Sequence, residues 1–156
     1  MIEPAVERDG AEILEITAQA GVFDLEEIDC VGELWNDYLN RGAEASGYYF
    51  LVYRQEGRLA GFACFGPRAL TQGTYDLYWI ATHPANRRQG VAQALLLQAE
   101  NEIRLKGGRL VFVETSGLPK YAGTRRFYLA SGYLNEATIR DFYSPGDDLV
   151  IFTRHL

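Results

Sequence analysis

A basic segment with one glycine lies at the start of an apolar, helix-like stretch: Arg87-Arg88-Gln89-Gly90-Val91-Ala92. The start of a helix leaves backbone N–H groups without partners and carries partial positive charge, so it favours a bound phosphate. Gly90 has no Cβ to keep a ligand away from the backbone. The two arginines add charge where a diphosphate would lie. The residues therefore indicate a diphosphate site or, alternatively, an ordinary loop with two solvated arginines.

The elements on either side of this segment would position it. Residues 75–82 alternate large side chains on both faces, which predicts a central strand, and Pro84 ends its pairing. From Val91 the apolar residues follow helical spacing, and Lys106-Gly107-Gly108 predicts the helix end. Residues 110–115 form the next apolar run. Together the three segments predict a right-handed crossover with a parallel strand pair.

Two motifs in this order resemble those of the GCN5-related N-acetyltransferases (GNAT). The family's diphosphate motif is Gln/Arg-x-x-Gly-x-Gly/Ala, and Arg87, Gly90 and Ala92 occupy its fixed places. Thr124 to Tyr133 resembles the later signature, in which Phe/Leu-Tyr precedes Gly-Phe/Tyr. The match covers roughly residues 48–156, and the preceding part agrees in its two predicted helices.

The resemblance implies transfer of an acetyl group from acetyl-CoA to a primary amine of a small molecule, amino acid, peptide or protein. The parallel strands would splay apart, and the opening would receive the pantetheine arm by pairing with exposed strand backbone. Tyr121 and Thr124 depart from the residue types usual at family positions that contact CoA. The implied cofactor-binding residues are Ile80, Ala81, Thr82, Arg87, Arg88, Gln89, Gly90, Val91, Ala92, Tyr121 and Thr124.

The resemblance also suggests the groups that move protons. Tyr128 matches the family's tyrosine acid: a phenol (pKa about 10) stays protonated beside a thiol (pKa about 8.5) and can donate to the departing sulfur. The alternative is that Tyr128 only packs. Asp76 falls where some members place a glutamate base, on a strand face predicted to include Tyr78 and Ile80. It would act directly, through water, or only by attracting the ammonium group, and Glu114 is the competing carboxylate.

The remaining segments complete one predicted domain over residues 1–156. We expect an α+β fold with three layers (α/β/α) and a mixed, mostly antiparallel sheet of six or seven strands, with one splayed parallel pair. Trp35 and Tyr38 either pack in the core or wall the acceptor pocket. The other predicted strands are 2–6, 48–53, 59–65, 133–142 and 149–152, and the other helices are 11–20, 24–39 and 121–130.

Composition limits the classes of function. A 156-residue chain suits one domain, and its net charge of −6 argues against a nucleic-acid partner. No apolar run approaches the roughly 20 residues that span a bilayer, and no secretory signal is evident. Cys30 and Cys64 lack metal-site spacing, so we expect no metal, and both are predicted to be buried in a reducing, cytoplasmic setting.

The expected partners are acetyl-CoA and an amine, with a homodimer as a further option. A rival hypothesis is a non-catalytic module that binds or senses acyl-CoA. A nucleotide-binding domain is less favoured, because the chain lacks both Gly-x-x-x-x-Gly-Lys and Gly-x-Gly-x-x-Gly.

Overall fold

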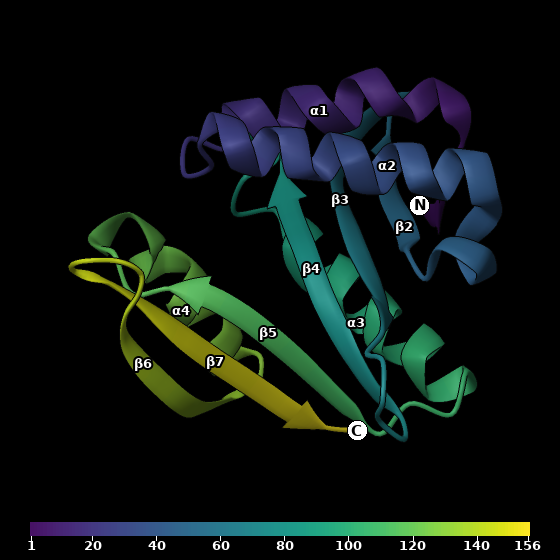
Figure 1. Ribbon diagram of the computed structural model, residues 1–156. Helices are drawn as coiled ribbons and strands as arrows, with labels where there is room; N and C mark the ends of the chain where they lie inside the picture. The colour runs from purple at the N-terminus through teal and green to yellow at the C-terminus, as the bar shows by residue number, and fades with distance from the viewer.

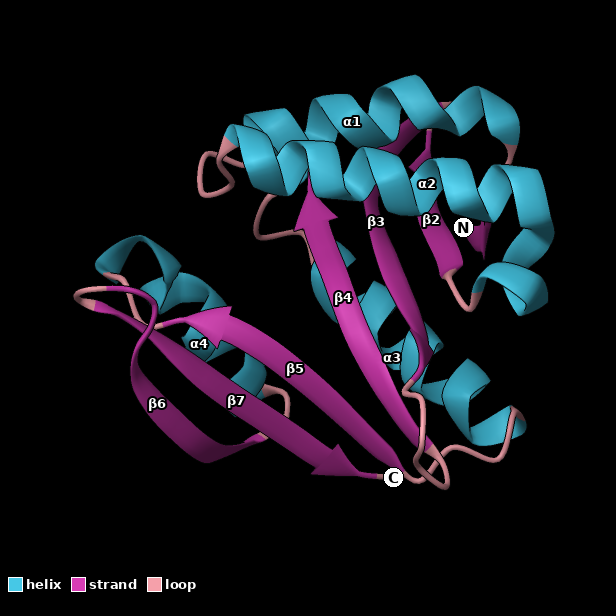
Figure 2. Cartoon of the chain, viewed as in Figure 1, coloured by secondary structure: helices cyan, strands magenta, loops and turns pink.

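The computed structural model describes residues 1–156 as one seven-stranded sheet with four α-helices (Figures 1 and 2). The strand order is β1-β2-β3-β4-β5-β7-β6, and only β4 and β5 pair in parallel. The strands are β1 (Ile2–Pro4), β2 (Tyr49–Gln55), β3 (Arg58–Pro67), β4 (Thr74–Thr82), β5 (Leu110–Ser116), β6 (Leu134–Ser144) and β7 (Asp147–His155). The helices are α1 (Gly10–Gln19), α2 (Leu25–Ser46), α3 (Val91–Leu105) and α4 (Ala122–Ala130), with short 3₁₀ turns η1 (Glu7–Asp9), η2 (Pro84–Asn86) and η3 (Pro119–Tyr121).

Helices cover both faces of the sheet, so the predicted three-layer fold is confirmed. α1 and α2 lie together on one face, over the half formed by β2, β3 and β4, while α3 and α4 lie on the other (Figure 1). The core under α1 and α2 contains Trp35, which is 4% exposed, and Tyr38 beside it donates a hydrogen bond to the carbonyl of Ala5. These two aromatic residues therefore stabilise the core.

The core on the opposite face extends across both halves of the sheet. It joins Leu95 and Ile103 of α3 to Leu77 of β4, Val113 of β5 and Phe152 of β7. The core under α1 and α2 contains no residue of β5, β6 or β7. One face of the C-terminal half of the sheet is therefore left without a helical layer.

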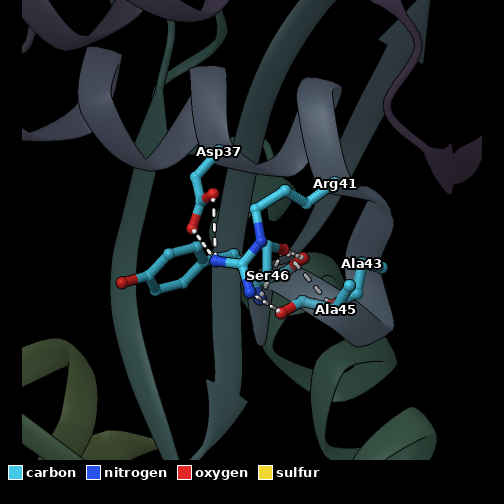
Figure 3. A network of polar contacts seen from close by, with 6 residues as sticks. Asp37, Arg41, Ala43, Ala45 and Ser46 are labelled. Carbon is cyan, nitrogen blue, oxygen red and sulfur yellow. Dashed lines mark hydrogen bonds and ion pairs between the residues drawn. The ribbon is translucent and has the colours of Figure 1, made fainter.

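Helix α2 begins as predicted and bends near its end. Asp24 caps it by accepting a hydrogen bond from the Glu27 amide at 2.8 Å. At Gly42 the backbone leaves the helical conformation (φ 80°, ψ 168°). Arg41 spans the bend, because Nη1 contacts Asp37 and Nη2 donates to the carbonyl of Ala45 at 2.7 Å (Figure 3). The bend directs the chain into β2.

Several local predictions also hold, whereas some boundaries differ: β1 ends at Pro4 instead of residue 6, and α2 extends to Ser46 instead of residue 39. The predicted strands 48–53 and 59–65 form the β2–β3 hairpin, and Glu56 and Gly57 both have positive φ, as a type I′ turn requires. Strands β6 and β7 are longer than predicted. The prediction that both cysteines are buried was wrong for Cys30: it lies on the exposed side of α2, because the inward stripe contains Val31 and Trp35. No helix is long and apolar enough to span a membrane.

Candidate active site

The parallel pair separates after only three register positions. β4 and β5 pair at Thr74↔Leu110, Tyr75↔Val111 and Asp76↔Phe112. Beyond that point β4 continues beside β3 as far as Thr82, and β5 beside β7, so the two strands diverge (Figure 1). Ile80, Ala81 and Thr82 therefore lie on a strand whose second edge has no partner strand, as the family resemblance implies. Backbone groups on such an edge require hydrogen bonds from elsewhere.

A β-bulge lies on β4 beside this opening. Trp79 pairs with Cys64 and Leu77 with Phe65, so Tyr78 is the extra residue. Asp76 and Tyr78 share a face, with the Tyr78 hydroxyl 3.5 Å from Asp76 Oδ2. Ile80 packs instead against the core under α3. The predicted common face of Asp76, Tyr78 and Ile80 was therefore wrong for Ile80, because the bulge changes the alternation.

The start of α3 leaves backbone amides open beyond the end of β4. Gly90 precedes the helix with φ 78°, no side chain caps this end, and the first helical hydrogen bond runs from the Ala94 amide to the Gly90 carbonyl. The amides of Val91 and Ala92 therefore lack helical partners. Arg88 also has a positive φ of 60°. Such a conformation costs about 1–3 kcal/mol in a non-glycine residue and is concentrated at functional loops.

The side chains of residues 87–89, before α3, differ in whether they are free to contact a ligand. Arg87 Nη2 donates to the carbonyl of Ala20 at 2.8 Å, so this guanidinium closes the end of α1. Gln89 Nε2 contacts the carbonyl of Ala85 at 3.3 Å. Arg88 is exposed. The open amides and Arg88 are thus free to meet a ligand, whereas Arg87 would first have to leave Ala20.

Tyr128 lies on α4 with its ring packed among Phe127, Tyr133 and Phe152, and it is 3% exposed. Burial alone raises its pKa well above the ordinary tyrosine value. Burial is the only influence on this pKa, and the Tyr128 hydroxyl forms no hydrogen bond within the protein. A neutral, unpartnered phenol of this kind can donate a hydrogen bond to a ligand.

Asp76 forms an ion pair that the sequence did not indicate. Its Oδ1 lies 2.7 Å from Nη1 of Arg68, and the Asp76 side chain is 11% exposed. The same Nη1 is 3.9 Å from Oε1 of Glu114. Both carboxylates that were predicted as candidate bases therefore lie beside one arginine. Arg68 follows β3 in a loop, and nothing in the local sequence distinguishes it from a solvated loop arginine.

Tyr121 makes contacts across the open end of the gap, the space between β4 and β5 beyond their last register pair. Its hydroxyl lies 3.0 Å from Oε2 of Glu27 and 3.1 Å from the carbonyl of Val22, which precedes α2. Phe23 packs edge-to-face on Trp79 of β4, with ring centroids 5.1 Å apart. Burial raises the pKa of Glu27, although the Tyr121 hydrogen bond acts in the opposite direction. The predicted cofactor residue Tyr121 thus contacts the N-terminal half, while Thr124 is half-buried on the first turn of α4.

Further aromatic residues lie near β4 and near the acidic side chains around the gap. Tyr48 packs against Tyr78 at 5.5 Å between ring centroids. Burial, with smaller contributions from Glu114, Asp147 and Glu27, raises the pKa of Tyr143 to about 12. The charges of carboxylates from three elements therefore act on the Tyr143 hydroxyl. The described chain contains no cluster of His, Cys, Asp and Glu suited to a metal ion.

Comparison with known proteins identifies the family of this chain. The model of the acetyltransferase (GNAT) family matches residues 12–133, and the chain belongs to this family. It is 41% identical to a Desulfovibrio desulfuricans protein whose crystal structure is described as a GNAT-family acetyltransferase, with a TM-score of 0.96 and coverage of 99% of this chain and 98% of that one.

Other relatives have named acceptors. The chain is 30% identical over 117 residues to the [ribosomal protein bS18]-alanine N-acetyltransferase of Escherichia coli K12, covering 73% of each sequence. The fold is shared with an aminoglycoside 6′-N-acetyltransferase solved with coenzyme A, at 12% identity and a TM-score of 0.77, covering 99% of this chain and 96% of that one.

Proposed function

We propose that this protein transfers an acetyl group from acetyl-CoA to a primary amine by direct attack. The observation that carries the proposal is the unpaired edge of β4 leading to the uncapped start of α3. A cofactor with a diphosphate at one end and an amide-containing arm at the other matches both features. The crystal structure of a relative of the same fold, complexed with coenzyme A, supports this cofactor.

In the proposed complex the diphosphate lies on the amides of Arg88 to Ala92. The pantetheine amides pair with the free edge at Ile80, Ala81 and Thr82, so the arm completes hydrogen bonding that β5 does not supply. Its thioester end then lies toward the narrow end of the gap, near Asp76 and Tyr78. The Arg87 side chain would contribute only after leaving the Ala20 carbonyl.

The proposed chemistry uses Tyr128 as the acid. Its buried phenol stays protonated, hydrogen-bonds the sulfur and donates a proton as CoA leaves. The amine must lose a proton, and Asp76 or a water beside it would accept it. Because Asp76 is already paired with Arg68, we favour a water, with Asp76 attracting the ammonium form of the acceptor. Glu114 is the alternative carboxylate at this point.

The decisive experiment measures CoA thiol release from acetyl-CoA with a panel of amines, amino acids and peptides. Tyr128→Phe should lower kcat by about 100-fold, within the range for a lost acid catalyst, and leave CoA affinity nearly unchanged. Tyr53→Phe, a partly buried tyrosine on β2, is the matched control. Wild-type protein that binds CoA but acetylates no acceptor, with Tyr128→Phe indistinguishable from it, would favour a sensing module instead.

A further inference from the structure

Arg68 lies at the point where the parallel strands separate. It is the first residue after β3, and its backbone is held by a hydrogen bond from its amide to the Thr74 carbonyl at 2.8 Å. The Thr71 hydroxyl donates to the Arg68 carbonyl at 2.8 Å. The base of the side chain is therefore fixed in the turn between β3 and β4.

The guanidinium contacts both strands at their last shared position. Its Nη1 bonds Asp76 on β4 at 2.7 Å, and its Cζ lies over the ring of Phe112 on β5, 4.8 Å from the centroid. Asp76 and Phe112 form the final register pair, and Glu114 is the next residue on that face of β5. One side chain thus links β4 and β5 where their backbone pairing ends.

The charge of Arg68 also balances the two carboxylates at the point where the strands separate. Asp76 and Glu114 lie on opposite sides of the opening, with the Arg68 cation between them. Without the cation, Asp76 would be a largely buried carboxylate with only the Tyr78 hydroxyl, 3.5 Å away, as a neutral partner, and the two anions would repel across the opening. The backbone supplies only three register pairs to resist that repulsion.

We infer that Arg68 is a positioning residue that sets where β4 and β5 separate, and thereby the site of the thioester end of the cofactor. This inference rests on the proposed acetyl transfer. The proposed diphosphate site, formed by the amides of Arg88 to Ala92, lies beyond the far end of β4 and has no contact with Arg68. Arg68 therefore governs binding of the pantetheine arm but not of the phosphates.

The test compares CoA with ADP, which carries a diphosphate but no pantetheine arm. Arg68→Gln should weaken CoA binding about tenfold and lower kcat at least as much, while ADP affinity stays within about twofold. Arg68→Lys keeps the charge but cannot lie flat on Phe112, so it should restore only part of the loss. Arg109→Gln is the control, because Arg109 Nε donates to the Gln72 carbonyl in the same loop without contacting Asp76 or Phe112.

A double variant tests whether any loss of CoA affinity comes from the unbalanced charge or from misfolding. Arg68→Gln/Asp76→Asn removes both charges, and it should recover CoA affinity relative to Arg68→Gln alone. Equal losses for CoA and ADP, or no loss for CoA, would overturn the inference. Wild-type protein that fails to bind CoA would overturn the proposed function itself, whereas active wild type with an unaffected Arg68→Gln would overturn only the role of Arg68.

Discussion

The hydroxyl of Tyr121 lies 3.0 Å from the carboxylate of Glu27, although the two residues are 94 positions apart in the chain. Tyr121 follows β5 in the C-terminal half of the sheet, whereas Glu27 lies in the first turn of α2. The same hydroxyl is 3.1 Å from the Val22 carbonyl. The two halves, which share only three register pairs between β4 and β5, are thus joined again at the open end of the gap.

Tyr121→Phe should loosen this second connection. The ring would keep its contact with Phe23, but the hydroxyl bonds to Glu27 and Val22 would be lost, at a cost of about 1–2 kcal/mol. Chemical denaturation should show the loss, and amides of residues 20–27 should exchange hydrogen faster. Unchanged exchange in that segment, with Tyr53→Phe as the reference, would contradict the role of Tyr121.

Glu27→Gln should show a pH-dependent effect on stability. Burial is the largest influence on Glu27 and raises its pKa, so the native state holds this proton more tightly than the unfolded state. Stability therefore falls as pH rises from the unfolded-state pKa through the raised native one. Relative to wild type, Glu27→Gln should gain stability between about pH 3 and pH 7, because glutamine stays neutral. A difference in unfolding free energy that is constant across this interval would refute the expectation.

Arg154→Met should be strongly destabilising. Glu100 on α3 is 1% exposed, and it accepts hydrogen bonds from the Tyr133 hydroxyl at 2.9 Å and from Arg154 Nη1 at 3.1 Å. Removing the cation would leave a buried charge with one neutral partner, at a cost of about 3–5 kcal/mol. Urea denaturation should show this loss, and Glu100→Gln/Arg154→Met should recover part of it. A double variant less stable than Arg154→Met would show that the lost charge is not the cause.

Gly61→Ala should displace the start of α3. A Cβ at Gly61 would lie 2.7 Å from the Ala81 carbonyl oxygen and 2.8 Å from Val91 Cγ1. Overpacking of this kind costs about 1–3 kcal/mol, and moving Val91 should also weaken CoA binding. Gly32→Ala is the matched control: its Cβ would meet only Leu14 at 3.7 Å, and alanine should favour helix α2. Titration calorimetry showing equal CoA affinity for Gly61→Ala and wild type would rule out this link.

The features predicted from sequence are those set by local spacing. The strand at 75–82, the helix from Val91 and the glycine before it follow from residues adjacent in the chain, and the crossover between parallel strands follows from chain geometry. The family motifs then identified the fold. The roles of Tyr128, Asp76 and the residues of the proposed diphosphate site in catalysis and binding stay predictions.

The features that sequence could not supply depend on distant partners. The Tyr78 bulge arises from the register between β3 and β4, which strict alternation does not reveal. Arg68 meets Glu114 and Phe112 only after β5 is placed beside β4. Arg87 has the charge and position expected of a residue that binds phosphate. Its side chain instead binds the end of α1, because the fold brings the Ala20 carbonyl beside it.

The core beneath α3 and α4 passes continuously behind the gap, whereas α1 and α2 cover only one side of its front. Helices therefore leave one face of the separated strands partly uncovered. In the proposed complex, the cofactor lies between β4 and β5 while the acceptor approaches through that face. Both substrates can be held at once, so the proposed transfer needs no acetylated protein intermediate, and a steady-state pattern of intersecting rather than parallel reciprocal plots is its kinetic signature.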